Sequence, residues 1–541
     1  MEKRRCLKSL SALLPLQNIV ALILIGLVIF LTRVIFVTVP PFQSDDSLYT
    51  YAAYAISRGV TPYKQIFLAH PPLLYFIVAG IIEVVGTNLV FIRFCNTGIL
   101  LATFFLTYLF AKVLLGDDEK SGITALSSAS IYAFYPMIVI FSIPVLVEFP
   151  FTLFTLASVI FYVMSFHSTR KSLIFLTGLF LGFALITKLT TFIFAASIVL
   201  FNGIVFTWQR KFKKVLSDTI LVTLGMALPL AVTLFLLHFH FNSLSQFYLQ
   251  SISFQTIRRQ MTSMDRWSSI SSYANSFFPL IITGVLGALY LIFDAKKRSD
   301  PTIVLPVWLY AFNALSLVIL PTIFTHYFIY LAPYLSFLSV VFLFEALSVI
   351  NTKGKSMINT GLLSRLRSRI LPVFLVLILL IASQIVTQVE TQIPYFYEGP
   401  YTKIELYIGN YVRNITDYDD MIWTSEGGIA FFAQRLIVAP NSSRWPMQAL
   451  FNDVFNSTFD DGSKGMGILT PEQFAEAWEQ ENVEVIVFIF GKGWVPYPDD
   501  LIWNGFQDQE GVASYVEQRY ELKHIVTAYE VPYIYEIWVR K

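Results

Sequence analysis

Two adjacent acids, Asp45 and Asp46, stand in the polar stretch 41–49, directly after a long apolar segment. Carboxylates accept a proton from a reacting hydroxyl or hold a divalent ion. If the apolar segment crosses a membrane from inside to outside, both acids lie at the outer surface, wet enough to stay ionised. The pair therefore predicts a catalytic site where a lipid-linked substrate would be used.

The composition predicts the kind of scaffold that positions these acids. The chain is 55% apolar and 14% charged, with 50 Phe among 541 residues and a mean hydropathy of +0.63, which is typical of a polytopic membrane protein. Lys and Arg gather in short loops rather than along one face, so no nucleic-acid partner is expected. Cys6 and Cys95 are the only cysteines, too few for a disulfide framework or a cysteine metal site.

Apolar runs long enough to cross a bilayer, about 20 residues each, recur until about residue 388. We expect about eleven spans. They lie near residues 19–39, 89–114, 121–141, 149–166, 172–188, 189–208, 216–238, 272–293, 302–323, 327–349 and 370–388. The first run lacks a small-residue cleavage site and is interpreted as a retained anchor.

The basic loops predict the orientation. Lys3, Arg4, Arg5 and Lys8 precede the first span and place the N-terminus in the cytoplasm. Every strongly basic loop then falls on the cytoplasmic side, provided that residues 70–86 form a helix at the outer interface. That segment is short for a span and opens with two prolines, which suit a helix start.

This topology collects the unusual ionisable residues at the outer ends of the spans. Such residues cost about 2.5 to 3.5 kcal/mol at mid-membrane, so a cluster of them predicts function. The set is Asp45, Asp46, His70, Glu148, Lys188, Arg258, Arg259, Asp265, Arg266 and His326. Its acids suit a base or metal-ligand role, and its cations suit a phosphate.

The residues also resemble a family. Asp45-Asp-Ser-Leu-Tyr49 is similar to the Asp-Glu-x-x-Tyr motif of the GT-C glycosyltransferases related to protein O-mannosyltransferases and lipid A aminoarabinose transferases. The family's further elements are matched in order. They are Gly59-Val-Thr-Pro-Tyr63, His70-Pro-Pro-Leu73, Gly178-Leu-Phe-Leu-Gly182 with Thr187-Lys188, and His326-Tyr-Phe-Ile-Tyr-Leu-Ala-Pro333. Two departures are Asp46 in place of the usual Glu, and Glu148 at the second acidic position, where Asp is common.

The resemblance implies a GT-C fold and an inverting transfer of a sugar, as by a hexosyltransferase, from a polyprenyl- or dolichyl-phosphate donor to an acceptor hydroxyl on a lipid, glycan or protein. Asp45 is the expected general base, with Asp46 beside it, a role worth about 10²- to 10⁴-fold. Glu148 would bind a divalent ion or orient the acceptor. The donor phosphate is assigned to Lys188 and His70 first, then to Arg258, Arg259, His326 and Tyr63.

Each assignment has a structural alternative. Asp46 or Ser44 would simply open a helix that contains Tyr49 and Tyr51. Lys188 would extend to the interface, His326 would be a structural hydrogen-bonding residue, and the Arg258-Arg259 pair would contact lipid headgroups. Glu83, Arg93 and Asp265 are interpreted as structural. Metal dependence stays open, with magnesium or manganese held by Asp45, Asp46 and Glu148 as the form it would take.

After a transmembrane domain at 1–388, a separate α/β domain is expected at 389–541, on the extracytoplasmic side. Strands are predicted at 421–424, 483–490 and 533–539, and helices at 471–481 and 512–520. Asn414, Asn441 and Asn456 begin glycosylation sequons there, while its acids, including Asp499 and Asp500, form no catalytic pattern.

Two rival functions remain. A secondary transporter would show internal repeats and mid-membrane ionisable residues, and neither is found. An oligosaccharide ligase or oligosaccharyltransferase would move a whole glycan, but the motif Trp-Trp-Asp-Tyr-Gly of the latter is absent. The predicted location is the cell membrane, since no retention signal is visible.

Overall fold

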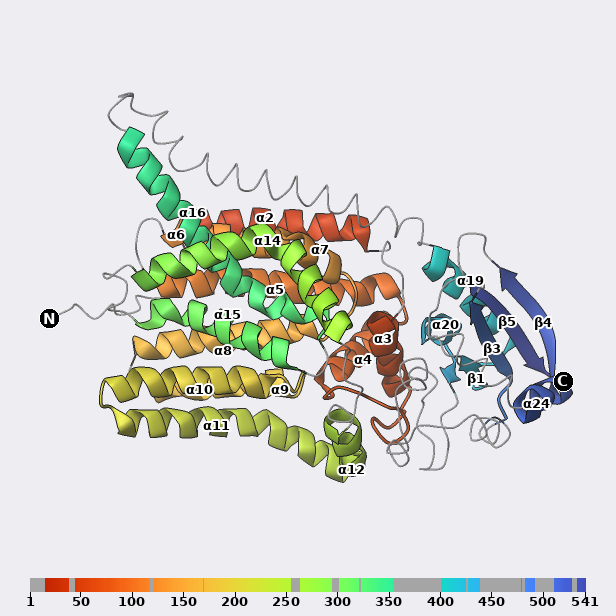
Figure 1. Cartoon of the computed structure of the whole chain (residues 1–541). Coiled ribbons are helices and arrows are strands. Elements are labelled where there is room, and N and C mark those ends of the chain that lie inside the picture. The colour runs from red at the N-terminus through yellow and green to blue at the C-terminus, as the bar shows by residue number, and fades with distance from the viewer. Residues whose placement is uncertain are drawn as a thin grey trace.

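The computed structural model describes the chain as a helical bundle followed by a C-terminal sheet region (Figure 1). The described residues are 15–37, 44–116, 121–168, 170–253, 263–293, 301–320, 323–354, 400–424, 427–437, 478, 482–491, 510–527 and 533–541. The bundle helices are α2 (Leu16–Phe36), α3 (Ser44–Ser57), α4 (Leu73–Val85), α5 (Leu89–Leu115), α6 (Ser121–Phe134), α7 (Pro136–Phe141), α8 (Glu148–Phe166), α9 (Lys171–Leu185), α10 (Thr191–Trp208), α11 (Phe212–Phe235), α12 (Leu244–Phe247), α14 (Ser263–Phe293), α15 (Pro301–Ile319) and α16 (Ala332–Gly354). Two π-helical segments, η1 (Leu236–His240) and η2 (Tyr248–Ser253), and one 3-10 segment, η3 (Thr325–Leu331), complete it.

Seven helices in the described part of the chain are long and apolar enough to cross a membrane, or eight if the bent α14 counts as one span. Seven of the predicted spans thus have a full-length helix. The predicted span 121–141 is instead broken into α6 and α7, and the span 172–188 is the 15-residue helix α9. The predicted span 370–388 lies outside the described residues.

The break between α6 and α7 has a clear chemical cause. Pro136 has no amide hydrogen and cannot continue the helical hydrogen-bond ladder, so a new helix begins there. Arg33, fully buried in α2, donates from Nη2 to the Ala133 carbonyl at 2.7 Å and from Nε to Ser142 Oγ at 3.1 Å. The guanidinium therefore satisfies polar groups on both sides of the break.

Helix α9 lies unusually close to α11, because glycines line their contact. A Cβ on Gly178 would stand 2.1 Å from the Val222 carbonyl oxygen, and one on Gly225 would stand 2.3 Å from the Phe175 carbonyl oxygen. Small residues permit such backbone approach between membrane helices. The Gly178 and Gly182 positions noted in the sequence thus have a packing role.

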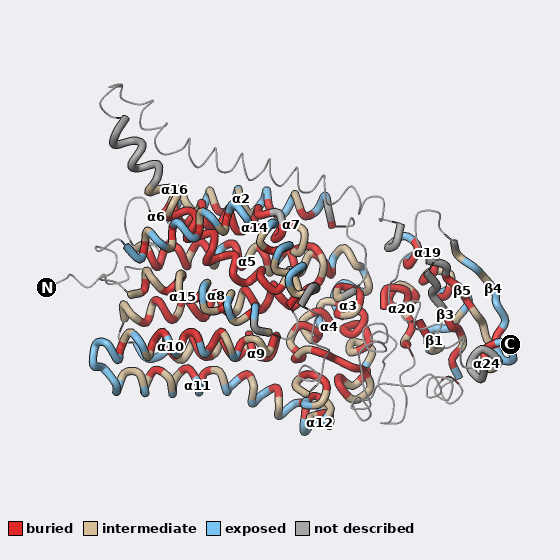
Figure 2. The backbone as a smooth tube through the Cα atoms, in the orientation of Figure 1, coloured by how far each residue is buried: buried red, intermediate tan, exposed pale blue. Residues whose placement is uncertain are grey.

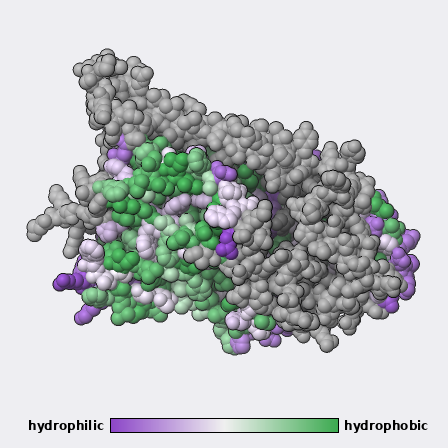
Figure 3. Space-filling view, in the orientation of Figure 1, coloured by the Kyte–Doolittle hydropathy of each residue, from purple (hydrophilic) through white to green (hydrophobic). Residues whose placement is uncertain are grey.

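The outer surface of the bundle is apolar. Figure 2 shows long stretches of α11 as exposed or intermediate, whereas α3 and α8 are mainly buried. Leu224, Leu228 and Val232 of α11 are each at least half exposed, as expected of side chains that face lipid. Figure 3 shows hydrophobic residues over the middle of the bundle and hydrophilic residues at the end where α10 connects to α11. Arg210 and Lys211 belong to that connection, and Lys213 and Lys214 to the first turn of α11.

Helices α3 and α4 lie at the opposite end of the bundle, next to the sheet region (Figure 1). Helix α4 has 13 residues and packs against α3, so the segment predicted as interfacial is a short helix that does not match the length of a span.

The C-terminal region holds a five-stranded sheet in the order β2-β1-β3-β5-β4. Its strands are β1 (Met421–Thr424), β2 (Leu436–Ile437), β3 (Val485–Gly491), β4 (Tyr520–Thr527) and β5 (Tyr533–Arg540), and its helices are α19 (Pro400–Ile415), α20 (Gly427–Ala433) and α24 (Glu510–Arg519). Strand β1 runs parallel to β2 and β3, while β5 pairs antiparallel with β3 and β4. The three predicted strands are present, β2 and β4 were not predicted, and the predicted helix 471–481 lies largely outside the described residues.

The sheet region docks on α3. The Ile437 backbone N–H donates to the Tyr51 hydroxyl at 2.6 Å, and the ring of Tyr54 meets that of Phe431 edge-on at 6.1 Å. Arg58 lies over the Tyr418 ring at 3.8 Å. Tyr51, Tyr54 and Arg58 follow one another at helical spacing, so one face of α3 is covered by residues that come more than 350 positions later.

Candidate active site

Four of the predicted site residues meet at the α3 end of the bundle, each from a different element. Asp45 lies in the first turn of α3, Glu148 begins α8, and Lys188 occupies the turn between α9 and α10. His326 comes from η3. Its Nε2 is 3.9 Å from Asp45 Oδ2 and 3.7 Å from Glu148 Oε1. Both acids stand at helix N-termini, where the helix dipole favours negative charge.

Glu148 and Lys188 form a buried ion pair. Lys188 Nζ donates to Glu148 Oε1 at 2.7 Å, and both side chains are almost inaccessible. The ammonium also lies 3.6 Å from the centre of the Tyr327 ring, a cation–π contact. Glu148 Oε2 has no hydrogen-bond partner within the described residues. The two charges thus compensate each other, and Glu148 Oε2 remains as a possible hydrogen-bond acceptor.

Asp45 differs from Glu148 in accessibility. Its side chain is 39% exposed, against 2% for Glu148. A general base must reach the hydroxyl that it deprotonates, so accessibility within a cluster of buried charges is what that role requires. The turn of α3 places the neighbouring Asp46 on another side of the helix, and the two adjacent acids do not share one environment.

Asp46 is 2% exposed and forms a structural network. Its Oδ2 accepts hydrogen bonds from Arg93 Nη2 at 2.7 Å and Arg93 Nε at 3.0 Å, and its Oδ1 accepts from the Val145 backbone N–H at 2.8 Å. Burial raises the pKa of this carboxyl, and the Arg93 guanidinium opposes that shift. Asp46 therefore ties α3 to α5 and to the segment that leads into Glu148. Arg93, expected from the sequence to be structural, is its partner.

His70 and Tyr63 belong to the loop between α3 and α4. The Tyr63 hydroxyl is buried and donates to the His70 carbonyl at 2.8 Å, while the Tyr63 carbonyl accepts from Gln250 Nε2 at 2.7 Å. Tyr63 adopts a positive φ of 64°, a conformation that such hydrogen bonds must hold in place. The His70 ring lies against the Tyr49 ring, with centroids 5.9 Å apart. The loop thus carries His70 to the edge of the cluster.

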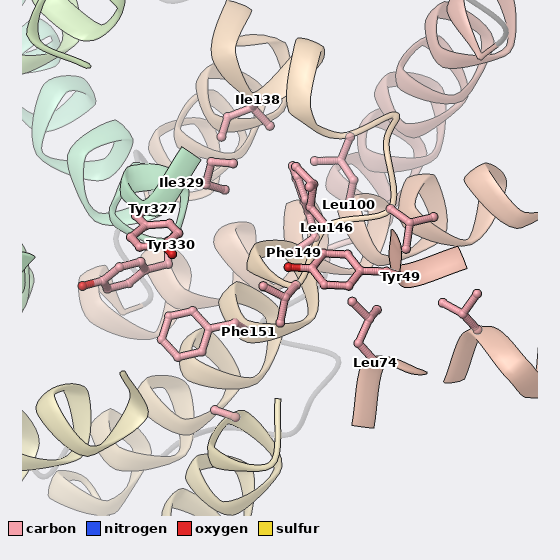
Figure 4. Close-up of a cluster of buried hydrophobic side chains, with 14 of the residues drawn as sticks. Tyr49, Leu74, Leu100, Ile138, Leu146, Phe149, Phe151, Tyr327, Ile329 and Tyr330 are labelled. Carbon is pink, nitrogen blue, oxygen red and sulfur yellow. The ribbon is translucent and has the colours of Figure 1, made fainter. Parts of the chain in front are cut away.

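Two aromatic residues at the site were not assigned from the sequence. Tyr327 carries the ring beside Lys188, and its position directly after His326 in the motif was the available signal. Tyr49, fully buried in α3, directs its hydroxyl into the cluster that includes Phe149, Tyr327 and Tyr330 (Figure 4). Burial raises the pKa of the Tyr49 phenol well above its usual value, so it stays protonated and is available as a donor.

Arg258 and Arg259 lie outside the described residues. For a metal ion, no group of three or more His, Cys, Asp or Glu side chains in the described part of the chain is placed to hold one. Both Asp46 oxygens already accept hydrogen bonds, and Glu148 is paired with Lys188. Among the described residues, the donor set does not fit a divalent ion in this arrangement.

This arrangement of helices, with an acid after the first span and a C-terminal region over it, is similar to the GT-C fold of solved membrane glycosyltransferases. The structure of ArnT from Cupriavidus metallidurans bound to undecaprenyl phosphate matches 97% of this chain and 98% of its own, with a TM-score of 0.65 and 11% identity. The same protein in the apo state matches 96% and 97%, with a TM-score of 0.56 and 12% identity. The Archaeoglobus fulgidus oligosaccharyltransferase, in complex with Zn and sulfate, matches 95% of this chain and 72% of its own at a TM-score of 0.50 and 12% identity.

The sequence comparison agrees with the fold. The family model described as dolichyl-phosphate-mannose-protein mannosyltransferase matches residues 69–237, a segment that includes His70, Glu148 and Lys188. No curated protein gives a significant sequence match. The structural matches show that the chain has the fold of these membrane enzymes, and the family model matches its residues 69–237.

Proposed function

We propose that this protein transfers a sugar from a polyprenyl- or dolichyl-phosphate donor to an acceptor hydroxyl with inversion at the anomeric carbon, and that Asp45 is the general base. The observation that carries the proposal is the placement of an accessible Asp45 carboxylate beside the buried Glu148, Lys188 and His326 in a GT-C fold. Asp45 takes the acceptor proton as the new glycosidic bond forms. The bond between the sugar and the phosphate breaks, and its electron pair leaves with the phosphate.

The remaining residues receive roles from their contacts. Lys188 has three N–H donors and uses one on Glu148, so we assign the others to the departing phosphate, where a fixed cation stabilises developing charge. Asp46 positions Asp45, and Tyr63 positions His70. Glu148 holds the ammonium of Lys188 in place through their ion pair. Arg258 and Arg259 remain proposed phosphate contacts.

The proposed setting is the cell membrane. We place the N-terminus in the cytoplasm and the active site with the 389–541 domain outside, because the basic connection between α10 and α11 lies at the bundle end opposite the acids. The acceptor is a lipid, a glycan or a protein hydroxyl, and the C-terminal domain over α3 is positioned to select it.

The test is sugar transfer by the purified protein in lipid nanodiscs, with labelled sugars on a panel of polyprenyl phosphates. Asp45→Asn should lower the transfer rate by about 10²- to 10⁴-fold, the usual worth of a general base. Glu521→Gln is the matched control, because Glu521 is a 57% exposed acid on β4 that forms an ion pair with Lys523, away from the cluster. Full activity in Asp45→Asn would show that Asp45 is not the general base. Solute flux through sealed vesicles in place of transfer would favour a transporter.

A further inference from the structure

His326 occupies a position between two carboxylates that the proposed phosphate contact does not explain. One ring nitrogen, Nε2, is 3.9 Å from Asp45 Oδ2 and 3.7 Å from Glu148 Oε1. The acids come from α3 and α8 and the imidazole from η3, so three separate elements converge on one nitrogen. A sub-ångström movement brings either oxygen within hydrogen-bond reach.

Aromatic rings fix the plane of this imidazole. It stacks on Phe324 with centroids 5.6 Å apart and planes 4° apart, and it meets Phe141 at 5.8 Å and Tyr327 at 5.0 Å, both edge-on. The side chain keeps 18% exposure. A ring clamped in this way presents Nε2 to the acids while retaining a path to water, which is the geometry of a proton carrier.

The two carboxylates near the His326 ring differ in their exposure to solvent. Glu148 is compensated by Lys188 at 2.7 Å and is nearly inaccessible, whereas the Asp45 side chain is 39% exposed. Lys188 in the α9–α10 turn, His70 before α4, Tyr49 in α3 and Tyr327 in η3 are the other titratable groups that face the cluster. Among all these groups, the imidazoles of His326 and His70 both accept and release a proton readily near neutral pH, and His326 is the one whose Nε2 lies within 4 Å of both carboxylates. A free imidazole is also a stronger base than a free carboxylate.

We infer that His326 is the proton relay of the reaction, with Nε2 taking from Asp45 Oδ2 the proton that Asp45 removed from the acceptor hydroxyl. The inference rests on the proposed function. Asp45 is thereby returned to the carboxylate form. The imidazolium is stabilised by Glu148, and it releases the proton to water before the next turnover. His326 acts through Asp45 and is a positioning and relay residue rather than the base itself.

The relay has a kinetic signature that distinguishes it from phosphate binding. A protonated His326 cannot accept a proton, so wild-type kcat should fall as the pH is lowered, and this fall is the acid limb of the pH profile. In His326→Gln, kcat should fall about 10- to 100-fold, this acid limb should move to lower pH, and the donor KM should change less than about twofold. Loss of a phosphate contact would instead raise the donor KM.

The experiment is the pH profile of kcat for sugar transfer in nanodiscs, for wild type, His326→Gln and Glu148→Gln. Glu148→Gln should also move the acid limb to lower pH, because the imidazolium loses its stabilising charge. His524→Asn is the control, since His524 lies in the C-terminal region against Tyr407 and Tyr411. Its profile should overlay that of wild type. If His326→Gln does not fold, added imidazole in His326→Ala should restore kcat.

The outcomes separate the two proposals. An unchanged acid limb in both His326→Gln and Glu148→Gln overturns the relay while leaving the transferase intact, and so does a raised donor KM with an unchanged kcat in His326→Gln. Absence of any transfer by the wild type overturns the proposed function and the relay together. A shifted acid limb, an unchanged donor KM and rescue by imidazole support the relay.

Discussion

Replacing Arg93 by Met should destabilise the protein strongly, because it leaves a carboxylate buried without its cation. Arg93 and Asp46 are 1% and 2% exposed. Two guanidinium nitrogens donate to Asp46 Oδ2, and Nη1 donates to the Val37 carbonyl at 2.9 Å. The substitution therefore orphans both a charge and a backbone acceptor at the junction of α2, α3 and α5.

The magnitude follows from the burial of the pair. Removing one partner of a buried ion pair costs about 3 to 5 kcal/mol, whereas replacing both partners by apolar side chains is often close to neutral. The double variant Asp46→Leu with Arg93→Met should thus regain much of the loss. It should stay below wild type by about 1 to 3 kcal/mol, because the Val145 N–H and the Val37 carbonyl lose their partners.

The assay is reversible unfolding in mixed micelles, followed by tryptophan fluorescence, with Lys523→Met as the control. Lys523 and Glu521 form an ion pair that is 45% and 57% exposed, so this control should not change stability measurably. The reasoning is refuted if Arg93→Met lies within about 1 kcal/mol of wild type, or if the double variant is no more stable than Arg93→Met.

Two further predictions concern packing and topology. Gly178→Ala should destabilise the protein by about 1 to 3 kcal/mol in the same unfolding assay, because the new Cβ would clash with the Val222 carbonyl between α9 and α11. Gly203→Ala is the control and should be tolerated, since open space surrounds Gly203. Equal effects of the two substitutions would contradict the close approach of α9 and α11. With both native cysteines replaced, Asp419→Cys should react with an impermeant maleimide added outside intact cells, and Lys211→Cys should react only after permeabilisation; the reverse pattern would invert the proposed orientation.

The sequence singled out residues that the structure brings together, but it could not predict their contacts. Asp45, Glu148, Lys188 and His326 were all selected by residue type, motif and inferred side of the membrane, and the structure brings them together. Their pairing was not predictable, because which cation meets which acid depends on helix rotation and packing. Lys188 was expected to contact the donor phosphate, which stays a prediction, and its ion pair with Glu148 was not foreseen.

The fold was likewise predictable from the sequence only in part. Apolar runs located the full-length spans, but hydropathy could not show that Pro136 breaks one run into two helices or that α9 is short. Strand β4 was missed because its alternation is weak and Leu522 and Ile525 are partly exposed. Strand β2, with two residues, is too short for any periodicity.

The docking of the sheet region on α3 has a consequence for biosynthesis. The hydrogen bond between Tyr51 and Ile437 joins residues 386 positions apart, so α3 emerges from the ribosome well before the sheet region. Contacts of such long sequence separation form late, and domains fold broadly in the order of synthesis. The helix that bears Asp45 must therefore wait for residues up to Ile437 before this face is covered. We expect the surface next to Asp45 to be completed late in folding, after the helices of the bundle have packed.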